Sequence, residues 1–439
     1  MLTNDARIRS GDREKGFYSL DGALRFFGED GIDGAHKKDM RDRILRGPPF
    51  SVQERADIFA YCRNDVDALV RLVPHIVPTI RSLPHAMMRA QFQWAIAQQE
   101  RRGVPIDLPM LERIRIRWDD MRVDVVTEMD KAYGCYEVTG GVAHWRKDRF
   151  KAYVRRNRLP WPTYPSGELD ESSDTFKDMA RAFPQIEPLR ELRSSLSKLR
   201  LSSLEVGSDG RNRASLWAYS SKTGRNQPST SGYIFGPAKW IRFLITPSAG
   251  YGLVHRDYRQ QEVHIAGVVS NDPELLAACQ APSVYIGIAQ QLGLAPLGAT
   301  KVSHPAIHAL FKSVTLGINY GLMARSLAAR TGLSLFEAVE ILARLRARFR
   351  VLEAFSRSVL DHAGLDLELA TQFDWRMSCP PGSNPRTLKN YPIQSSAAEV
   401  LHVACILAER RGLEIVAPVH DDLNGTSANR RARGCLDRA

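Results

Sequence analysis

Residues 415–423 read Ile-Val-Ala-Pro-Val-His-Asp-Asp-Leu, an apolar run that ends in a histidine and two adjacent carboxylates. The pattern predicts a short strand that runs into a tight turn. Because neighbouring side chains on a strand point to opposite faces, only one of Asp421 and Asp422 can face a given site. A second apolar run, residues 253–257, also ends in a carboxylate, Asp257.

Two strands of one sheet that each end in an aspartate would bring together the hard oxygen ligands that Mg²⁺ prefers. Such a pair of strand ends is the smallest frame for two-metal phosphoryl transfer. The alternative is that both segments are ordinary turns, in which aspartate is common.

Length and composition indicate a soluble, globular protein large enough for several cores, with 439 residues, 44% of them hydrophobic and 25% charged. The 61 lysines and arginines outnumber the 49 acidic residues and give a net charge of +12. That excess favours a polyanionic partner, nucleic acid first and an anionic membrane second. A basic surface without a partner is the alternative.

The sequence contains no apolar run of transmembrane length, and its first residues lack the apolar core of a signal peptide. The six cysteines are scattered without a Cys-x-x-Cys pair. We therefore expect reduced thiols, no structural zinc site and a cytoplasmic location.

Apolar periodicity predicts helices over most of residues 1–214 and 271–370. Residues 215–270 are expected to be strand-like around Trp217, Phe243 and Leu253. Near the C-terminus we expect a helix from Ser396 to Arg411, capped by Ser395 or Ser396, before the final strand. Beyond Leu423 the apolar pattern fades, and no further strand is expected.

On a helix over residues 306–321, a stripe of side chains recurs at four-residue spacing: His308, Lys312, Leu316 and Tyr320. A stripe that mixes a cation with apolar and aromatic groups suits a nucleotide better than a core. A lysine alone on a helix is more often simply solvated.

Two further segments are polar. Residues 221–227 form a loop with two cations and a glycine, which is either a clamp for a phosphate backbone or an ordinary surface loop. Arg386, Asn390 and Gln394 are again spaced by four, which suggests an edge that contacts a ligand rather than a core.

In chain order these motifs resemble those of the family A DNA polymerases, the class that includes bacterial polymerase I. The resemblance spans roughly residues 85–423. Its motifs are Thr223-Gly224-Arg225, Asp257-Tyr258-x-Gln260-x-Glu262, Lys312-x7-Tyr320-Gly321, Arg386-x3-Asn390-x3-Gln394 and His420-Asp421-Asp422.

The resemblance implies a right-hand α+β fold of thumb, palm and fingers, and two Mg²⁺ ions as cofactors. It makes Asp257 and Asp421 the metal-holding carboxylates, with the backbone carbonyl of Tyr258 as a further ligand. Asp422, where the family usually has glutamate, would have an auxiliary catalytic role.

The resemblance also implies roles in substrate binding. Glu262 would exclude a 2′-hydroxyl, Lys312 would neutralise the triphosphate, and Tyr320 would stack at the templating position. The expected nucleotide-binding residues are Gln260, Glu262, His308, Lys312, Leu316 and Tyr320. The expected DNA-binding residues are Thr223, Arg225, Arg386, Asn390, Gln394 and His420.

Besides Asp422, three further positions depart from the family pattern. His308 stands where arginine is usual, so we expect weaker triphosphate binding, since histidine is mostly neutral at pH 7. His264 also stands where arginine is usual. Leu316 replaces a phenylalanine or tyrosine, so it gives no prediction about the sugar 3′ position.

The implied domains follow the motifs. They are a partial RNase H-like 3′–5′ exonuclease remnant (1–84), a thumb-like helical region (85–214), the first part of the palm (215–270), the fingers (271–394) and the second part of the palm (395–439). Tyr61-x3-Asp65 resembles the third exonuclease motif, but Asp12-Arg13-Glu14 lies too close to it to supply the first. We therefore expect a chain shortened at both ends, without working proofreading.

The sequence thus predicts a template-directed DNA polymerase of replication or repair that uses deoxynucleotides and primer-template DNA. It is expected to act as a monomer and not on a membrane. The alternative is a catalytically impaired, DNA-binding remnant of a polymerase. A nuclease is disfavoured by the missing upstream carboxylates, and a single-subunit RNA polymerase is disfavoured by Glu262.

Overall fold

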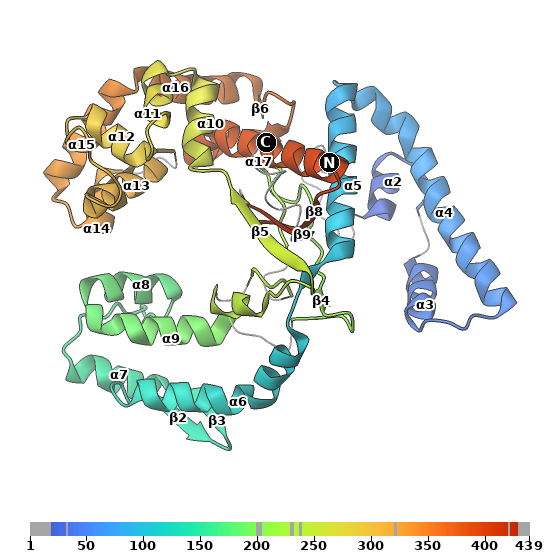
Figure 1. Cartoon of the computed structure of the whole chain (residues 1–439), viewed down its shortest axis with the longest axis horizontal. Helices are drawn as coiled ribbons and strands as arrows, with labels where there is room; N and C mark the ends of the chain where they lie inside the picture. Colours follow the sequence, from blue (N-terminus) through green and yellow to red (C-terminus); the bar gives the residue numbers. More distant parts are fainter. Residues whose placement is uncertain are drawn as a thin grey trace. The chain divides into compact units, whose positions relative to one another are not determined.

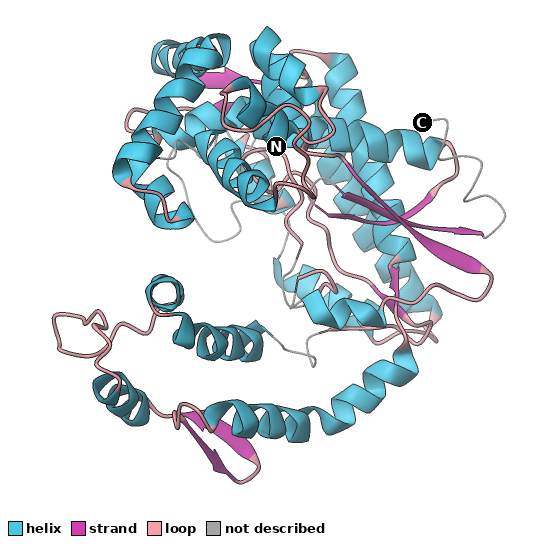
Figure 2. Ribbon diagram, turned by 60° about the vertical axis from the view of Figure 1, so that its left-hand side comes forward, coloured by secondary structure: helices cyan, strands magenta, loops and turns pink. Residues whose placement is uncertain are grey.

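The computed structural model describes residues 19–31, 34–198, 204–228, 232–236, 239–319, 323–419 and 422–428. These residues form the predicted mixture of helices and short strands (Figures 1 and 2). They divide into two compact units. Unit 1 holds the described residues up to Gln93 together with Tyr219–Arg225 and Tyr258–Ala404, and unit 2 holds Trp94–Ala218, Asn226–Asp257 and the described residues from Cys405.

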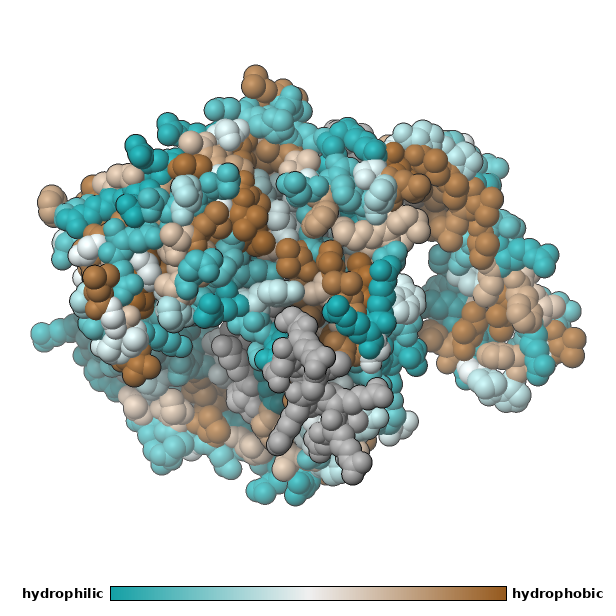
Figure 3. Space-filling model, turned by 45° about the horizontal axis from the view of Figure 1, so that its top comes forward, coloured by the Kyte–Doolittle hydropathy of each residue, from teal (hydrophilic) through white to brown (hydrophobic). Residues whose placement is uncertain are grey.

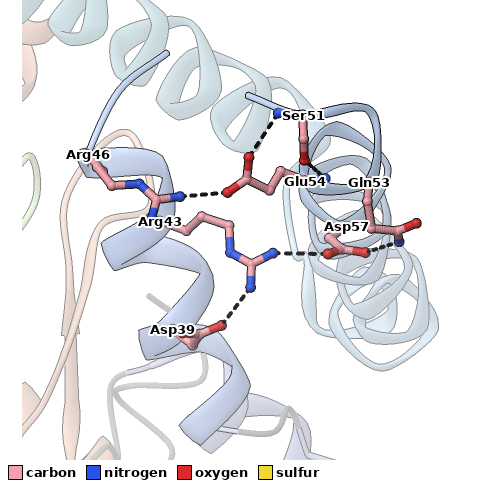
Figure 4. A network of polar contacts seen from close by, with 7 residues as sticks. All are labelled: Asp39, Arg43, Arg46, Ser51, Gln53, Glu54 and Asp57. Atoms are coloured by element: carbon pink, nitrogen blue, oxygen red, sulfur yellow. Dashed lines mark hydrogen bonds and ion pairs between the residues drawn. The ribbon is translucent and has the colours of Figure 1, made fainter. Parts of the chain in front are cut away.

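Unit 1 begins with helices. They are α2 (Leu20–Phe26), α3 (Gly34–Leu45) and α4 (Val52–Ile76), followed by the 3₁₀ turn η1 (Val77–Thr79) and by α5 (Leu83–Arg102), whose residues up to Gln93 belong to this unit. Ser51 and Glu54 form a capping box that satisfies free backbone N–H groups at the start of α4 (Figure 4). Arg46 pairs with Glu54 at 2.6 Å, and Arg43 pairs with Asp57 at 2.9 Å, so α3 is fastened to the first turns of α4.

Helix α4 has two different faces. One face packs Ala68 and Leu72 against Leu24 of α2 in a small core. On other faces apolar side chains are exposed, including Val52 (86% exposed) and Phe59 (74% exposed). Brown, hydrophobic atoms accordingly show on the surface of this helical region, at the right of Figure 3.

The rest of unit 1 packs helices around one apolar core that includes Val284, Phe311 and Leu327. The helices are α10 (Gln261–Ser270), α11 (Pro273–Cys279), α12 (Val284–Gln291), α13 (Pro305–Asn319), α14 (Ala324–Thr331), α15 (Leu335–Arg348) and α16 (Arg350–Asp366). The buried Asp272 caps α11 and also accepts a hydrogen bond from the backbone N–H of Leu352 in α16, at 2.9 Å. A hairpin of β6 (Glu368–Ala370) and β7 (Arg376–Ser378) then leads to α17 (Pro385–Arg410), whose residues up to Ala404 belong to this unit.

Unit 2 contains a helical region with an aromatic core. Its elements are α6 (Leu108–Asp130), the hairpin β2 (Tyr136–Thr139) and β3 (Val142–Trp145), α7 (Lys147–Arg156), α8 (Ser173–Ala182), the 3₁₀ turn η2 (Pro184–Ile186) and α9 (Glu187–Lys198). Phe150, Trp161 and Phe176 pack together at the centre. The Arg193 guanidinium lies over the rings of both Trp145 and Phe176, at 4.2 and 4.3 Å from their centroids.

Unit 2 also holds a three-stranded antiparallel sheet with the order β5-β9-β8. Its strands are β5 (Tyr251–Asp257), β8 (Glu414–Val419) and β9 (Asp422–Ala428), and two short strands, β1 (Val104–Pro105) and β4 (Arg211–Asn212), form a separate pair. The predicted strands before Asp257 and before the His-Asp-Asp motif are confirmed.

The expectation of no further strand beyond Leu423 is wrong, because β9 is the central strand of this sheet. Its backbone pairs with both neighbours, and backbone pairing does not require apolar side chains. Gly425 fits the close approach of β8, since a Cβ atom there would lie 3.1 Å from the carbonyl oxygen of Glu414.

Two other expectations are corrected. Helix α17 begins at Pro385, so Ser395 and Ser396 lie inside it and cap nothing. The helix continues through Pro392 because its neighbours Tyr391 and Ile393 are buried, and burial outweighs one lost backbone hydrogen bond. Of the segments expected to be strand-like in 215–270, only that around Leu253 is a strand. Phe243 lies in a 3₁₀ helix, η4 (Lys239–Leu244), and Trp217 lies in a loop.

None of the helices in the described part of the chain combines the length and the apolar character needed to cross a membrane.

Candidate functional site

The carboxylate edge of the sheet in unit 2 is built by strand register. Strands β5 and β8 both run antiparallel to β9, so they are parallel to each other and end at the same edge. Asp257, the last residue of β5, pairs with Asp422, the first residue of β9, and Asp422 pairs with Val419 on its other side. The side chain of Asp257 is exposed. His420 and Asp421 lie outside the described residues.

A polar row leads along one face of the sheet to this edge. His255 lies two residues before Asp257, on the same face of β5. Its Nδ1 atom is 2.9 Å from Oδ1 of Asn424, the residue opposite it on β9. Further along, Thr426 donates a hydrogen bond to Glu414 across β9 and β8, at 3.3 Å.

The sheet edge fits Mg²⁺ in its donor chemistry. Within the described ranges, no three histidine, cysteine, aspartate or glutamate side chains are grouped so as to hold a metal ion. Mg²⁺ needs only one or two carboxylates, because waters and substrate phosphates supply its remaining ligands. Asp257 is an exposed carboxylate at a strand end, and Tyr258, which follows it, is 39% exposed.

In unit 1, Arg225 and Glu262 form an ion pair. Nη2 of Arg225 lies 3.1 Å from Oε1 of Glu262, and both side chains are largely shielded from solvent. Glu262 is in the first turn of α10, where a negative charge is favourable. Gln260, the N-cap residue of α10, has a left-handed backbone with φ of 48°. The structure therefore brings together two of the predicted site residues from positions 37 apart.

The loop that carries Arg225 is a tight turn. The backbone N–H of Gly224 donates to the carbonyl of Ser221 at 3.0 Å, and the Ser221 and Thr223 hydroxyls are 3.1 Å apart. Gly224 has φ of +79°, a conformation that disfavours other residues. The ring of Trp375 covers it so closely that a Cβ atom on Gly224 would lie 3.3 Å from the ring.

Helix α13 carries His308 and Lys312 on one stripe, as predicted. Lys312 is exposed. Burial lowers the pKa of His308, and the charges of Lys301 and Lys312 lower it further, so this histidine is neutral at pH 7. Leu316 belongs to the same helix. Tyr320 lies outside the described residues.

The three polar residues of α17 differ in burial. Arg386 in the first turn is exposed, Asn390 is 5% exposed, and Gln394 is partly buried. The oxygen of the Asn390 side chain has no hydrogen-bond partner among the described residues. Of these three residues of α17, only Arg386 is therefore fully exposed to solvent.

Behind the Arg225 loop lies a group of residues that the sequence analysis did not identify: Trp375, Thr371, Glu399 and His402. Burial raises the pKa of Glu399 to about 7, although the Thr371 hydroxyl and Arg89 work against the shift. Burial lowers the pKa of His402 to about 3, opposed by a hydrogen bond to the backbone of Gly224. These positions carry no periodic signal, and only their tertiary contacts reveal them.

Comparison with known proteins shows what the chain is similar to. Residues 236–434 match the model of DNA polymerase family A. DNA polymerase I of Caldicellulosiruptor bescii is 26% identical over 43% of this chain and 24% of its own length. The thermostable DNA polymerase I of Thermus caldophilus is 22% identical over 91% of this chain and 48% of its own length. The chain therefore spans less than half the length of these curated relatives.

A solved structure has the same fold. The POL domain of Pol1 from M. smegmatis, in complex with DNA primer-template and dNTP, superposes with a TM-score of 0.67. That match covers 97% of this chain and 75% of the other, at 22% sequence identity. The fold is therefore that of a DNA polymerase I polymerase domain. The family match adds that residues 236–434 of the chain are similar in sequence to DNA polymerase family A.

Proposed function

We propose that this chain is a template-directed DNA polymerase that adds deoxynucleotides to the 3′ end of a primer by two-metal phosphoryl transfer. The observation that carries the proposal is the sheet edge in unit 2, where Asp257 ends β5 beside the start of β9. Strand register holds this carboxylate at the edge, and its side chain is exposed to solvent.

The metal-binding residues in this proposal are Asp257, Asp421 and the backbone carbonyl of Tyr258, with Asp422 in an auxiliary role. When bound, two Mg²⁺ ions would supply activation of the primer hydroxyl and neutralisation of the triphosphate charge. Of these residues, Asp257 is held at the sheet edge by the pairing of β5 with β9, where its carboxylate supplies negative charge.

The remaining site residues bind and select substrate. Lys312 is an exposed cation suited to the triphosphate. Glu262 is held in place by Arg225 and would leave a 2′-hydroxyl badly placed, so deoxynucleotides are preferred. Gln260, His308, Leu316 and Tyr320 complete the nucleotide-binding set.

The DNA partner is bound mainly through its backbone, since the template strand itself supplies the sequence information. The residues for this role are Thr223, Arg225, Arg386, Asn390, Gln394 and His420. The net charge of +12 supports binding that is independent of sequence and weakens with salt.

The proposal assigns no proofreading to this chain. Tyr61 and Asp65 of the Tyr-x3-Asp motif both lie on α4, where Lys37 is 4.0 Å from the Asp65 carboxylate. Residues 1–84 as an exonuclease remnant remain a prediction.

Primer extension tests the function directly. The chain, a labelled primer-template, Mg²⁺ and single dNTPs should give addition of only the nucleotide that the template specifies, and EDTA should stop it. DNA binding without any extension would instead favour the catalytically impaired remnant. In the same assay Glu262→Ala should ease incorporation of ribonucleotides, whereas unchanged sugar selection would remove Glu262 from its assigned role.

A further inference from the structure

Trp375 sits in unit 1, in the turn between β6 and β7, and is fixed there by hydrogen bonds to its backbone. Its N–H donates to the Thr371 hydroxyl at 2.9 Å, and its carbonyl accepts from the Tyr391 hydroxyl at 2.7 Å. Thr371 in turn donates to the buried Glu399 at 2.8 Å. Because Tyr391 and Glu399 both belong to α17, that helix determines where the tryptophan lies.

The side chain of Trp375 in turn holds the loop that carries Arg225. Its indole Nε1–H donates to the carbonyl of Lys222 at 2.9 Å, and its ring covers Gly224. The ring also stacks on Tyr219, with centroids 5.3 Å apart and planes at 26°. Trp375 is only 8% exposed, so the loop rests on a buried and rigid support.

The loop ends at Arg225, whose guanidinium pairs with Glu262. A displacement of Lys222 or Gly224 would therefore displace this pair, since only a few rotatable bonds separate them. The Ser221 N–H bond to the Arg225 carbonyl, at 3.2 Å, closes the turn and transmits such a displacement.

From these contacts we propose that Trp375 is a positioning residue for primer-template binding, acting through the backbone of Lys222 and Gly224 on Arg225. The inference rests on the proposed polymerase function and deepens it. Trp375 itself contacts neither DNA nor nucleotide in this proposal. An aromatic ring without the indole N–H, as in Trp375→Phe, should consequently support folding but hold the loop less well.

The experiment is a double-mutant cycle between Trp375→Phe and Arg225→Ala, read by fluorescence anisotropy of a labelled primer-template. Loss of one hydrogen bond predicts a Kd about fivefold higher for Trp375→Phe. In the Arg225→Ala background the same change should have no further effect, because residues that act as one unit are not additive. Gly224→Ala disturbs the contact between Gly224 and the Trp375 ring from the loop side, so it should also raise the Kd for the primer-template. In the Arg225→Ala background it should likewise have no further effect.

Trp94→Phe is the matched control, because Trp94 is 50% exposed on α5. It should leave the Kd unchanged. Thermal unfolding of every variant separates positioning from folding, since a purely structural role would lower the melting temperature and leave the Kd of the folded fraction unchanged.

The outcomes are distinct. Additive effects of Trp375→Phe and Arg225→Ala, with a wild type that extends primers, would overturn the positioning role alone. A wild-type chain that neither binds nor extends the primer-template would overturn the polymerase function, and the positioning role with it.

Discussion

The sheet edge in unit 2 and the network around Trp375 in unit 1 place their polar groups in opposite surroundings. Asp257 is exposed at the end of a strand, and its position depends on backbone register alone. Glu399 is 3% exposed and reaches the Arg225 loop through Thr371 and Trp375. In the proposed function, the exposed Asp257 carboxylate therefore takes part in the chemistry, whereas the buried polar groups hold the Arg225 loop in place.

The largest expected effect tests the exposed edge. Asp257→Asn keeps the size of the side chain but removes its charge, so primer extension should fall by about a thousandfold or more. Single-turnover extension at saturating dNTP measures it. Stability in urea should change little, because the side chain is exposed.

Asp361→Asn is the control for this prediction, since Asp361 is an exposed aspartate on α16. It should extend primers at the wild-type rate. Full activity of the Asp257→Asn variant would show that the Asp257 carboxylate is not needed for catalysis.

The next effect tests the buried network. Burial raises the pKa of Glu399 from 4.5 to about 7, so the folded chain keeps a proton that the unfolded chain loses. The contribution of this group to the free energy of unfolding is therefore fully present below pH 4.5, and it is lost as the pH rises from there through about 7. Glu399→Gln imitates the protonated form and should gain about 2 kcal/mol relative to wild type between pH 5 and pH 8.

Urea unfolding at the two pH values measures this gain. His402, whose pKa is lowered, makes an opposite contribution that is lost as pH falls below 6.5, but it is common to both proteins and cancels in the difference. The exposed Glu168→Gln should show no such pH dependence. A constant difference between wild type and Glu399→Gln would contradict the buried, proton-binding role.

A smaller effect tests an exposed cation of unit 1. Lys312→Ala should reduce kcat/KM for dNTP by about tenfold, the range of one charge-assisted hydrogen bond. Lys301→Ala is the control, because Lys301 is also exposed and also lowers the pKa of His308. An equal loss of kcat/KM in both variants would mean that Lys312 acts through the overall positive charge of this region and not through a specific contact with the triphosphate.

The smallest effect concerns the polar row beside Asp257. His255→Ala removes the contact with Asn424 and should destabilise the sheet by about 1 kcal/mol or less, because the pair is exposed. Asn424→Ala should destabilise the sheet more, because the Asn424 side chain also donates to the carbonyl of Ala417 at 3.3 Å, and the double variant should cost less than the sum of the two single changes. If the extension rates stay close to wild type, the catalytic residues lie only at the edge of the sheet. A large drop would show that the catalytic site also includes His255 or Asn424.

Much of the candidate site could be predicted because its signals are local. The apolar runs before Asp257 and His420, and the four-residue spacing of His308 and Lys312, follow from strand and helix geometry within a few residues. The family model matches residues 236–434, the part of the chain that contains these segments. Individual roles within the site remain predictions for the experiments above.

Other features could not be predicted, because they depend on segments far apart in the chain. Strand β9 has little apolar pattern of its own and exists because β5 and β8 bond to both of its edges. Helix α17 begins at Pro385 and not at the expected Ser396, because the core around Tyr391 stabilises its first turns.

The sequence by itself therefore determined the order of the motifs, the resemblance that they carry and the local form of several of the elements around them. Only the tertiary structure decided which residues share a contact. Arg225 meets Glu262 from 37 positions away, and Trp375 meets Lys222 from 153 positions away. Periodicity reports which face of an element is buried, but the partner on that face is chosen by packing of the whole chain.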